Sequence, residues 1–458
     1  MAKPFPTTAL VLAAGFLLIM ASSGCGRVEL NDELEYPDRT SPVVLMEKHP
    51  DQGPPGFPPP GKPPVSVDWL VSRGVSVLDP QSIKGVAWAS GWMAALKEES
   101  ARHFGDPGKP RVGATDTPLI ATLSVELGLD ESKLAEGSRL YRRLCVQCHG
   151  VTGDGLGAAS LWLSPAPRDL RTGDFKFIST AEHKLPTGFQ PLKARPRMDD
   201  LVKTLRVGLE GTSMPSFALL GDGPLESLAA YVIHLSCRGE LEQAVITGIL
   251  RQDKETSQAV AKSPAQEEVI RYKRMLSTTL EWDDPEADVD DFMAKLSAPS
   301  IKLYAEKYID RMLREYIAAN KNPIPVPAYP YPEDKPIPPA SIIAGHALFK
   351  AQCVNCHADY GRQSDLRFEV WGSVVRPANL TLSRYKGGRR PIDIYYRIAR
   401  GIPPCAMPKA NLGDSAPAKA GWDLVNFLMA LPHPEHLPDE VRAQVYGGSL
   451  SRKSGTTP

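Results

Sequence analysis

Two short stretches of this chain carry side chains that could hold a metal cofactor, Cys145–His149 and Cys353–His357, and each reads Cys-x-x-Cys-His. Two thiols three positions apart lie about one helical turn from each other, so both can form thioether bonds along one edge of a porphyrin. The histidine that follows then places its imidazole beneath the iron. Because this spacing is the attachment signature of c-type haem, the sequence predicts two covalently bound haem c groups with their iron.

Two other chemistries would use similar residues. A four-cysteine zinc ribbon needs its cysteine pairs about 15–20 residues apart, whereas these pairs are separated by about 200 residues. A thioredoxin-type dithiol needs no histidine after the second cysteine, and no βαβ pattern surrounds either stretch. Both comparisons favour haem.

The two signatures belong to a longer internal repeat. A glycine and an aromatic residue stand eight and four positions before the first cysteine of each signature: Gly137 and Tyr141 in the first copy, Gly345 and Phe349 in the second. Residues at this spacing share one helix face, where a small residue allows a second helix to cross closely. The predicted crossing helices are the later apolar ones that bear Tyr231 and Phe427.

Further along, each copy carries an aspartate, a glycine and a Met-Pro pair at identical spacing: Asp200, Gly208, Met214 and Pro215, then Asp393, Gly401, Met407 and Pro408. Helices often end at glycine, so each Met-Pro pair should follow the end of a helix. A methionine can simply fill a gap in a core. Recurrence at matching positions instead favours iron ligation by Met214 and Met407, with Met198 and Met429 as less suitable competitors.

The copies differ in length. Their first cysteines are 208 positions apart and their Met-Pro methionines 193, so the first copy holds fifteen extra residues. We place this extra chain between Gly173 and Arg197.

The order of these features resembles the class I cytochrome c family, in which a helix leads into Cys-x-x-Cys-His and a Met-Pro loop precedes the closing helix. The resemblance covers about residues 131–237 and 341–431. The resemblance implies thioether bonds to haem from Cys145 and Cys148 and from Cys353 and Cys356. It implies His149 and His357 as proximal iron ligands and Met214 and Met407 as distal ones. It also implies that a loop carbonyl, at Pro167 and at Pro377, accepts the axial histidine's second N–H.

We therefore predict a mainly α protein in which two cytochrome c-type helical haem domains are joined by a charged helical segment and proline-rich linkers. The expected segments are a signal (1–25), a proline-rich tether (26–67), an N-terminal helical extension (68–130), a first cytochrome c domain (131–237), a charged connector with its linker (238–340), a second cytochrome c domain (341–431) and a tail (432–458). The linkers are expected to be flexible, which leaves the distance between the haems open.

The N-terminus reads as a targeting segment. Lys3 precedes an apolar run from Leu10 to Ala21, and small residues lead to Cys25. This resembles a bacterial lipoprotein signal, with an uncleaved anchor or an ordinary cleaved signal as alternatives. All three place the protein outside the cytoplasm, on the periplasmic side and membrane-associated.

The charge balance and the cysteine count argue against two classes of protein, those that bind nucleic acid and those held together by disulfides. Lys plus Arg and Asp plus Glu balance at 53 each, so no net charge argues for nucleic-acid binding. The three cysteines outside the signatures, an odd number, do not suggest a disulfide framework. Cys237 and Cys405 are expected to be small buried residues.

His/Met ligation fills both axial positions and raises the reduction potential. The sequence therefore favours a dihaem electron carrier of a membrane-associated respiratory chain over an enzyme. Its expected partners are another cytochrome, a quinol-oxidising complex or a terminal oxidase, and two tethered cytochrome domains resemble haem subunits of cbb3-type oxidases. The alternatives are a dihaem cytochrome c peroxidase, which needs one open haem, and a partner-binding subunit of a larger oxidoreductase complex.

Overall fold

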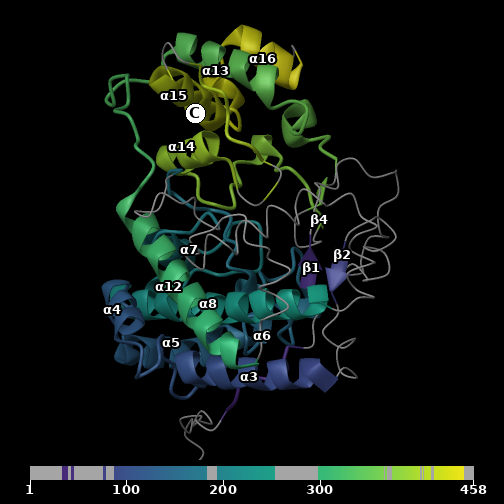
Figure 1. The fold of residues 1–458 in the computed structure, drawn as a ribbon. Helices are drawn as coiled ribbons and strands as arrows, with labels where there is room; N and C mark the ends of the chain where they lie inside the picture. Colours follow the sequence, from purple (N-terminus) through teal and green to yellow (C-terminus); the bar gives the residue numbers. More distant parts are fainter. Residues whose placement is uncertain are drawn as a thin grey trace, which may run out of the picture.

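A computed structural model of the chain describes residues 34–39, 43–45, 76–78, 87–182, 193–252, 298–365, 367–368, 374–402, 405, 407–413 and 417–447. The fold is mainly α, as predicted, and its described helices form two bodies stacked one above the other (Figure 1). The first body contains α3 (Ala87–Phe104), α4 (Pro118–Glu126), α5 (Glu131–Leu144), α6 (Val146–His149), α7 (Met198–Val207), α8 (Asp222–Gln252) and α12 (Ala298–Lys321). The second contains α13 (Pro339–Gln352), α14 (Pro391–Arg400), α15 (Pro417–Ala430) and α16 (Asp439–Tyr446).

Strands are few and short. β1 (Val43–Leu45) pairs antiparallel with β2 (Ser76–Leu78), with Val44 opposite Val77. β3 (Arg367–Phe368) pairs antiparallel with β4 (Val374–Val375). Six 3₁₀ turns complete the described elements: η3 (Ser160–Trp162), η4 (Leu170–Thr172), η5 (Ala218–Leu220), η6 (Ala358–Gly361), η7 (Leu380–Leu382) and η8 (Pro434–His436).

Each body is built on one close helix crossing, and both crossings occur where the sequence predicts them. α5 crosses α8 at Gly137, where an added Cβ would lie 2.0 Å from the Ser227 carbonyl oxygen. α13 crosses α15 at Gly345, where an added Cβ would lie 2.0 Å from the Asp423 carbonyl oxygen. Only glycine lets the two backbones approach so closely, which is why Gly137 and Gly345 recur in the repeat.

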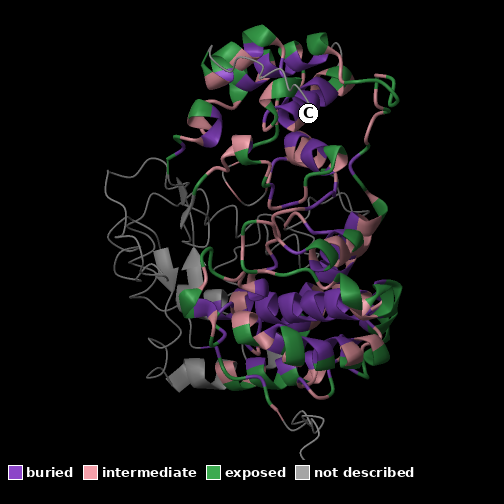
Figure 2. Cartoon of the chain, turned by 180° about the vertical axis from the view of Figure 1, so that it is seen from behind, coloured by how far each residue is buried: buried purple, intermediate pink, exposed green. Residues whose placement is uncertain are grey.

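The first body extends beyond the predicted domain boundary at residue 237, because α8 continues without a break to Gln252. Figure 2 shows the middle of this long helix buried, in agreement with the full burial of Leu228 and Leu241. α12, which we expected in the charged connector, packs back against α3, α4 and α8, and its Ile309 and Met312 are fully buried in the same core. Part of the expected connector is therefore core. Residues 253–297 of the expected connector, between α8 and α12, lie outside the described residues.

The N-terminal extension also joins this core. The expected helical extension (68–130) contains α3, which packs on α8 and buries Leu96 and Phe104. His234 of α8 donates a hydrogen bond from Nε2 to the Phe104 carbonyl oxygen at 2.9 Å. The extension is thus part of the first body.

The linker between the bodies is docked on the second body, contrary to the expected flexible connection. The Trp422 ring donates from Nε1 to the Pro327 carbonyl oxygen at 2.9 Å. The Tyr329 hydroxyl donates to Asn426 at 3.1 Å, and the Tyr331 hydroxyl donates to Asp423. Aromatic residues between the prolines anchor this segment on α15, so composition alone was a poor guide to its flexibility.

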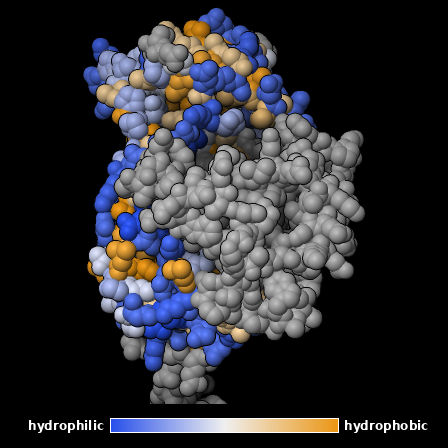
Figure 3. Space-filling view, in the orientation of Figure 1, coloured by the Kyte–Doolittle hydropathy of each residue, from blue (hydrophilic) through white to orange (hydrophobic). Residues whose placement is uncertain are grey.

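The expected C-terminal tail is also partly folded, because α16 buries Val441 and Val445 against the second core. The expected signal (1–25), most of the expected proline-rich tether (26–67) and residues 448–458 lie outside the described part of the chain. Among the described helices, none is long and apolar enough to span a membrane. Figure 3 shows hydrophilic side chains interspersed with smaller hydrophobic groups over the described surface of one face.

Candidate haem-binding sites

The first Cys-x-x-Cys-His stretch follows a well-capped helix. The Asp130 side chain accepts a hydrogen bond from the Lys133 amide at 3.0 Å, which satisfies one free N–H at the start of α5. α5 ends at Leu144, and the His149 amide then donates to the Cys145 carbonyl at 2.8 Å. This bond closes the turn that holds the two thiols and the imidazole together.

The second stretch has the same backbone geometry. The Cys353 amide donates to the Phe349 carbonyl at 2.8 Å, as the Cys145 amide does to Tyr141. The His357 amide donates to the Cys353 carbonyl, also at 2.8 Å. All four thiols of the signatures are free of disulfides. Burial raises the pKa of Cys145 to about 12 and that of Cys353 to about 11.

Both histidines are oriented by a backbone carbonyl. His149 Nδ1 lies 3.1 Å from the Arg168 oxygen, and His357 Nδ1 lies 3.1 Å from the Ala378 oxygen. A carbonyl oxygen can only accept, so Nδ1 is the donor and Nε2 keeps its lone pair for a metal. Burial lowers the pKa of both rings even though these hydrogen bonds raise it. Each imidazole is thus held neutral in the tautomer that can bind iron through Nε2.

The prediction that Pro167 and Pro377 supply these carbonyls is wrong by one residue in each copy. The physical reason lies in the residue after each acceptor. The Asp169 side chain accepts from the Arg171 amide at 3.0 Å and so begins η4, and the Asn379 side chain does the same for Thr381 at the start of η7. These caps set the direction of the preceding carbonyl.

A sequence signal for this arrangement exists and was missed. Each copy places an Asp or Asn directly before a leucine, and both leucines, Leu170 and Leu380, are buried anchors. Short polar residues at such positions favour turns and caps. Asp169 and Asn379 are therefore positioning residues that our reading of the sequence overlooked.

The two Met-Pro loops are closed in the same way. α7 ends before Gly208 and α14 before Gly401, and these glycines have φ values of 74° and 75°. The Leu209 amide donates to the Met214 carbonyl at 3.1 Å, and the Ile402 amide donates to the Met407 carbonyl at 3.0 Å. A further pair of matching bonds holds the far side of each loop: Phe217 N to Leu205 O at 3.0 Å, and Ala410 N to Ile398 O at 2.9 Å.

These contacts distinguish the predicted ligands from their competitors. Met214 and Met407 are both partly buried and sit in equivalent loops. Met198 is the first residue of α7, so it lies at the opposite end of that helix from the Met214 loop, roughly 14 Å along the axis. Met429 lies on α15 and packs against the second core. The loops of Met214 and Met407 have matching hydrogen bonds, which supports these two methionines over their competitors. Iron ligation by them stays a prediction.

The donor sets suit a covalent haem. Each copy brings a pair of free thiols, an imidazole with Nε2 available and a partly buried thioether loop to one body. The copies differ in the backbone after the histidine. The first uses Gly150, Gly153 and Gly155 at positive φ, whereas the second places Asp359 and Tyr360 at φ values of 48° and 57°. In the second copy the Tyr360 ring stacks on Phe349, with 5.5 Å between ring centroids.

The remaining described cysteines lie elsewhere in their bodies. Cys237 is fully buried on α8, as expected, and burial raises the pKa of its thiol. The expectation that Cys405 is buried is wrong, because this residue is only half-buried in the loop two residues before Met407.

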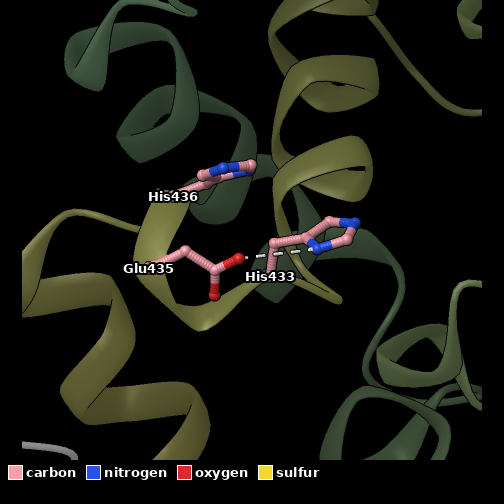
Figure 4. Close-up of side chains that lie close together, drawn as sticks. All are labelled: His433, Glu435 and His436. Atoms are coloured by element: carbon pink, nitrogen blue, oxygen red, sulfur yellow. Dashed lines mark ion pairs between the residues drawn. The ribbon is translucent and has the colours of Figure 1, made fainter. Parts of the chain in front are cut away.

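A separate group of ligating side chains lies beyond α15. His433, Glu435 and His436 bring their nitrogen and oxygen atoms within 4.8 Å of one another, and all three are exposed (Figure 4). His433 Nδ1 is 3.7 Å from the Glu435 carboxylate. Within the described part of the chain, this is the group in which three potential metal-ligand atoms lie this close together. It is distant in sequence from the predicted haem ligands, and the first copy of the repeat has no equivalent group.

Comparison with known proteins bears on the first copy. Residues 132–232 match the family described as cytochrome c oxidase, cbb3-type, subunit III. No curated protein matches the chain. A solved chain of the reducing HAO-like protein complex of Kuenenia stuttgartiensis is similar at 19% identity, with a TM-score of 0.36, over 65% of this chain and 95% of that one. That level of likeness supports no inference about function.

The family match falls on the part of the chain that holds the first attachment turn, the oriented His149 and the Met214 loop. These observations agree with one another. The protein therefore contains a c-type cytochrome domain over residues 132–232, and such a domain implies covalently bound haem c.

Proposed function

We propose that this protein is a dihaem c-type cytochrome that transfers single electrons. The observation that carries the proposal is the repeat in three dimensions. The His357–Ala378 hydrogen bond and the Ile402–Met407 bond of the second body reproduce the His149–Arg168 and Leu209–Met214 bonds of the first. Because the family match covers only the first copy, the second haem rests on this correspondence.

Each residue type has a distinct role in the proposed carrier. The cysteines would attach the haem, and the histidine would bind the iron through Nε2 while its Nδ1 stays on a backbone carbonyl. The methionine loop would close the opposite side, which leaves no position for oxygen or peroxide and raises the potential. When bound, the haem iron would supply the redox couple, and these residues would hold the haem in place and exclude other ligands.

The setting of this activity is also proposed. The expected lipoprotein signal at Cys25 would tether the protein on the extracytoplasmic side of a membrane, where its partners would be redox proteins of a respiratory chain. The family that residues 132–232 match is named for a subunit of an oxidase. That name supports a place beside a terminal oxidase or another respiratory complex.

The test is the haem content of the full chain produced with c-type haem maturation. Haemochrome absorbance of the purified protein should give two haems per chain, and the methionine–iron charge-transfer absorption should account for both. A variant with Cys353→Ala and Cys356→Ala should retain one haem, and the matched Cys145→Ala and Cys148→Ala variant should also retain one.

Two other outcomes would contradict the proposal that this protein is a dihaem electron carrier. One haem per wild-type chain would remove the dihaem proposal. A high-spin haem that binds external ligands and turns over peroxide would favour the peroxidase alternative, because an electron carrier of this type keeps both axial positions filled.

A further inference from the structure

The fifteen extra residues of the first copy fall within residues 174–197, and the described part of this segment contacts the second body. We call its described residues, 174–182 and 193–197, the brace. We propose that the brace and α7 hold the two cytochrome bodies in one fixed arrangement, so that electrons pass directly from haem to haem. This inference rests on the proposed dihaem function.

The first contact joins the two helices that lead into the methionine loops. α14 lies directly above α7 in Figure 1. Lys203 of α7 places its Nζ 2.5 Å from Asp393 Oδ1 and 3.3 Å from the Gly387 carbonyl oxygen. The Asp393 side chain is 1% exposed. A nearly buried carboxylate of one body is thus neutralised in part by a lysine of the other.

The repeat shows what this lysine contributes. Asp200 and Asp393 occupy equivalent positions in the first turns of α7 and α14. Asp200 accepts hydrogen bonds within its own body, from the Ser179 amide at 2.8 Å and the Ser179 hydroxyl at 2.6 Å. The second copy has no brace to supply such donors. Lys203 supplies one across the interface, together with Arg390 of the second body.

The brace makes the second contact. Glu182 lies 3.0 Å from Arg400, the last residue of α14, and 3.2 Å from Lys409, two residues after Met407. Phe177 packs against Gly387, where an added Cβ would come within 2.4 Å of the phenylalanine ring. The two ion pairs of Glu182 therefore join the brace to residues on both sides of Met407, and the Phe177 contact joins it to the residues before α14.

The brace is itself firmly attached to the first body. Arg195 is fully buried and ion-paired with Glu240 of α8 at 2.5 Å and with Glu315 of α12 at 2.8 Å. Thr180 donates from its hydroxyl to the Arg195 carbonyl at 2.7 Å, which connects the two described parts of the brace.

The brace also binds the start of the linker. The Ile324 amide donates to the Ser179 carbonyl at 2.7 Å, and the Ala181 amide donates to the Asn322 carbonyl at 2.9 Å. The linker then docks on α15, as described above. The second body is therefore held by its own linker, by the brace and by Lys203, at three separate places. Because electron tunnelling slows steeply with distance, a fixed arrangement would keep the rate of direct transfer between the haems constant, whereas loosely joined bodies would vary it.

The experiment uses the full holoprotein and compares Lys203→Met with Lys133→Met. Lys133 forms an ion pair with Glu226 inside the first body, so its variant removes a lysine without touching the interface. One haem is reduced by a rapid pulse, and the equilibration between the two haems is followed by absorbance. Small-angle scattering on the same samples measures the overall dimensions.

We expect Lys203→Met to slow interhaem equilibration at least tenfold and to increase the radius of gyration, while both haems keep their spectra. Lys203→Arg should restore the rate, and Lys133→Met should leave both quantities unchanged. Glu182→Gln, at an exposed position, is a second variant that should slow the rate even if Lys203→Met does not fold.

The results separate the two proposals. Two haems per chain with an unchanged rate and unchanged dimensions would overturn the fixed arrangement and leave the dihaem function standing. This result is sought in the Lys203→Met, Glu182→Gln double variant or, where Lys203→Met does not fold, in Glu182→Gln alone. One haem per wild-type chain would overturn the dihaem function. In that case the scattering comparison would still decide whether Lys203 and Glu182 hold the bodies together.

Discussion

At the scale of single residues, the glycine that follows α7 and the one that follows α14 are each needed for two reasons. Gly208 adopts a φ of 74°, which side chains with a Cβ rarely accept. In addition, a Cβ there would lie 2.7 Å from the Pro215 carbonyl carbon and 2.8 Å from the Met214 oxygen. Gly401 has the same φ and the same kind of contact with Met407. The glycine therefore brings the Met-Pro loop back against its helix.

Gly208→Ala should accordingly destabilise the first body more than Gly211→Ala does. Gly211 has a φ of 77° but no atom within 4 Å of an added Cβ, so it shares the backbone strain and lacks the overlap. We expect the loss in unfolding free energy to exceed that of the control by about 1–3 kcal/mol, the usual cost of overpacking. Urea denaturation measures it, and weaker methionine–iron absorption should accompany it. Equal losses in the two variants would show that the contact has no consequence.

At the scale of elements, the crossing of α5 and α8 positions the whole first site. α5 delivers Cys145 at its end, and α8 closes the body behind it. Tyr141 and Tyr231 meet at this crossing with ring centroids 5.3 Å apart. A shift between the helices would therefore move the attachment turn.

Gly137→Ala tests this crossing against Gly223→Ala in α8. In an open helical position the change from glycine to alanine stabilises by up to about 1 kcal/mol, and Gly223 has no atom within 4 Å of an added Cβ. At Gly137 the new Cβ would overlap the Ser227 carbonyl. We expect Gly137→Ala to lower the unfolding free energy by about 2 kcal/mol or more and to reduce haem incorporation into the first copy. A neutral Gly137→Ala would contradict the close crossing.

At the scale of the whole molecule, two buried histidines link the stability of the first body to pH. Burial lowers the pKa of His234 to about 4, and burial together with the charge of Arg102 lowers that of His103 to about 4. In the unfolded chain a histidine titrates near 6.5. Between these values the unfolded state binds more protons, so the unfolding free energy falls as pH drops from about 6.5 to about 4.

His234→Gln should flatten this dependence, because Gln does not titrate and can still donate to the Phe104 carbonyl. Each histidine adds at most about 1.4 kcal/mol per pH unit to the slope. The slope of unfolding free energy against pH, measured for wild type and variant, should differ by nearly this amount. An identical slope in His234→Gln would mean that His234 is charged in the folded protein.

Much of the fold and of each site could be predicted, because the determining interactions are local or repeated. The Cys-x-x-Cys-His turns, the glycines at the helix crossings and the glycine before each Met-Pro loop all occur where the sequence places them. The acceptor carbonyls were misplaced by one residue. Their direction depends on side-chain caps at Asp169 and Asn379 rather than on the prolines.

The chemistry of the two candidate sites could be predicted from the sequence alone, since thiol spacing, the adjacent imidazole and the repeated methionine are properties of neighbouring residues. How the copies are joined could not, because it depends on contacts between residues far apart in the chain. Lys203 meets Asp393 across 190 positions, and Arg195 meets Glu315 across 120. No local pattern records such pairings, because a charge in the sequence reads the same whether it is solvated or buried against a partner. The flexibility of the proline-rich segment was mispredicted for the same reason. Its composition does not show that Tyr329 and Tyr331 form hydrogen bonds with α15.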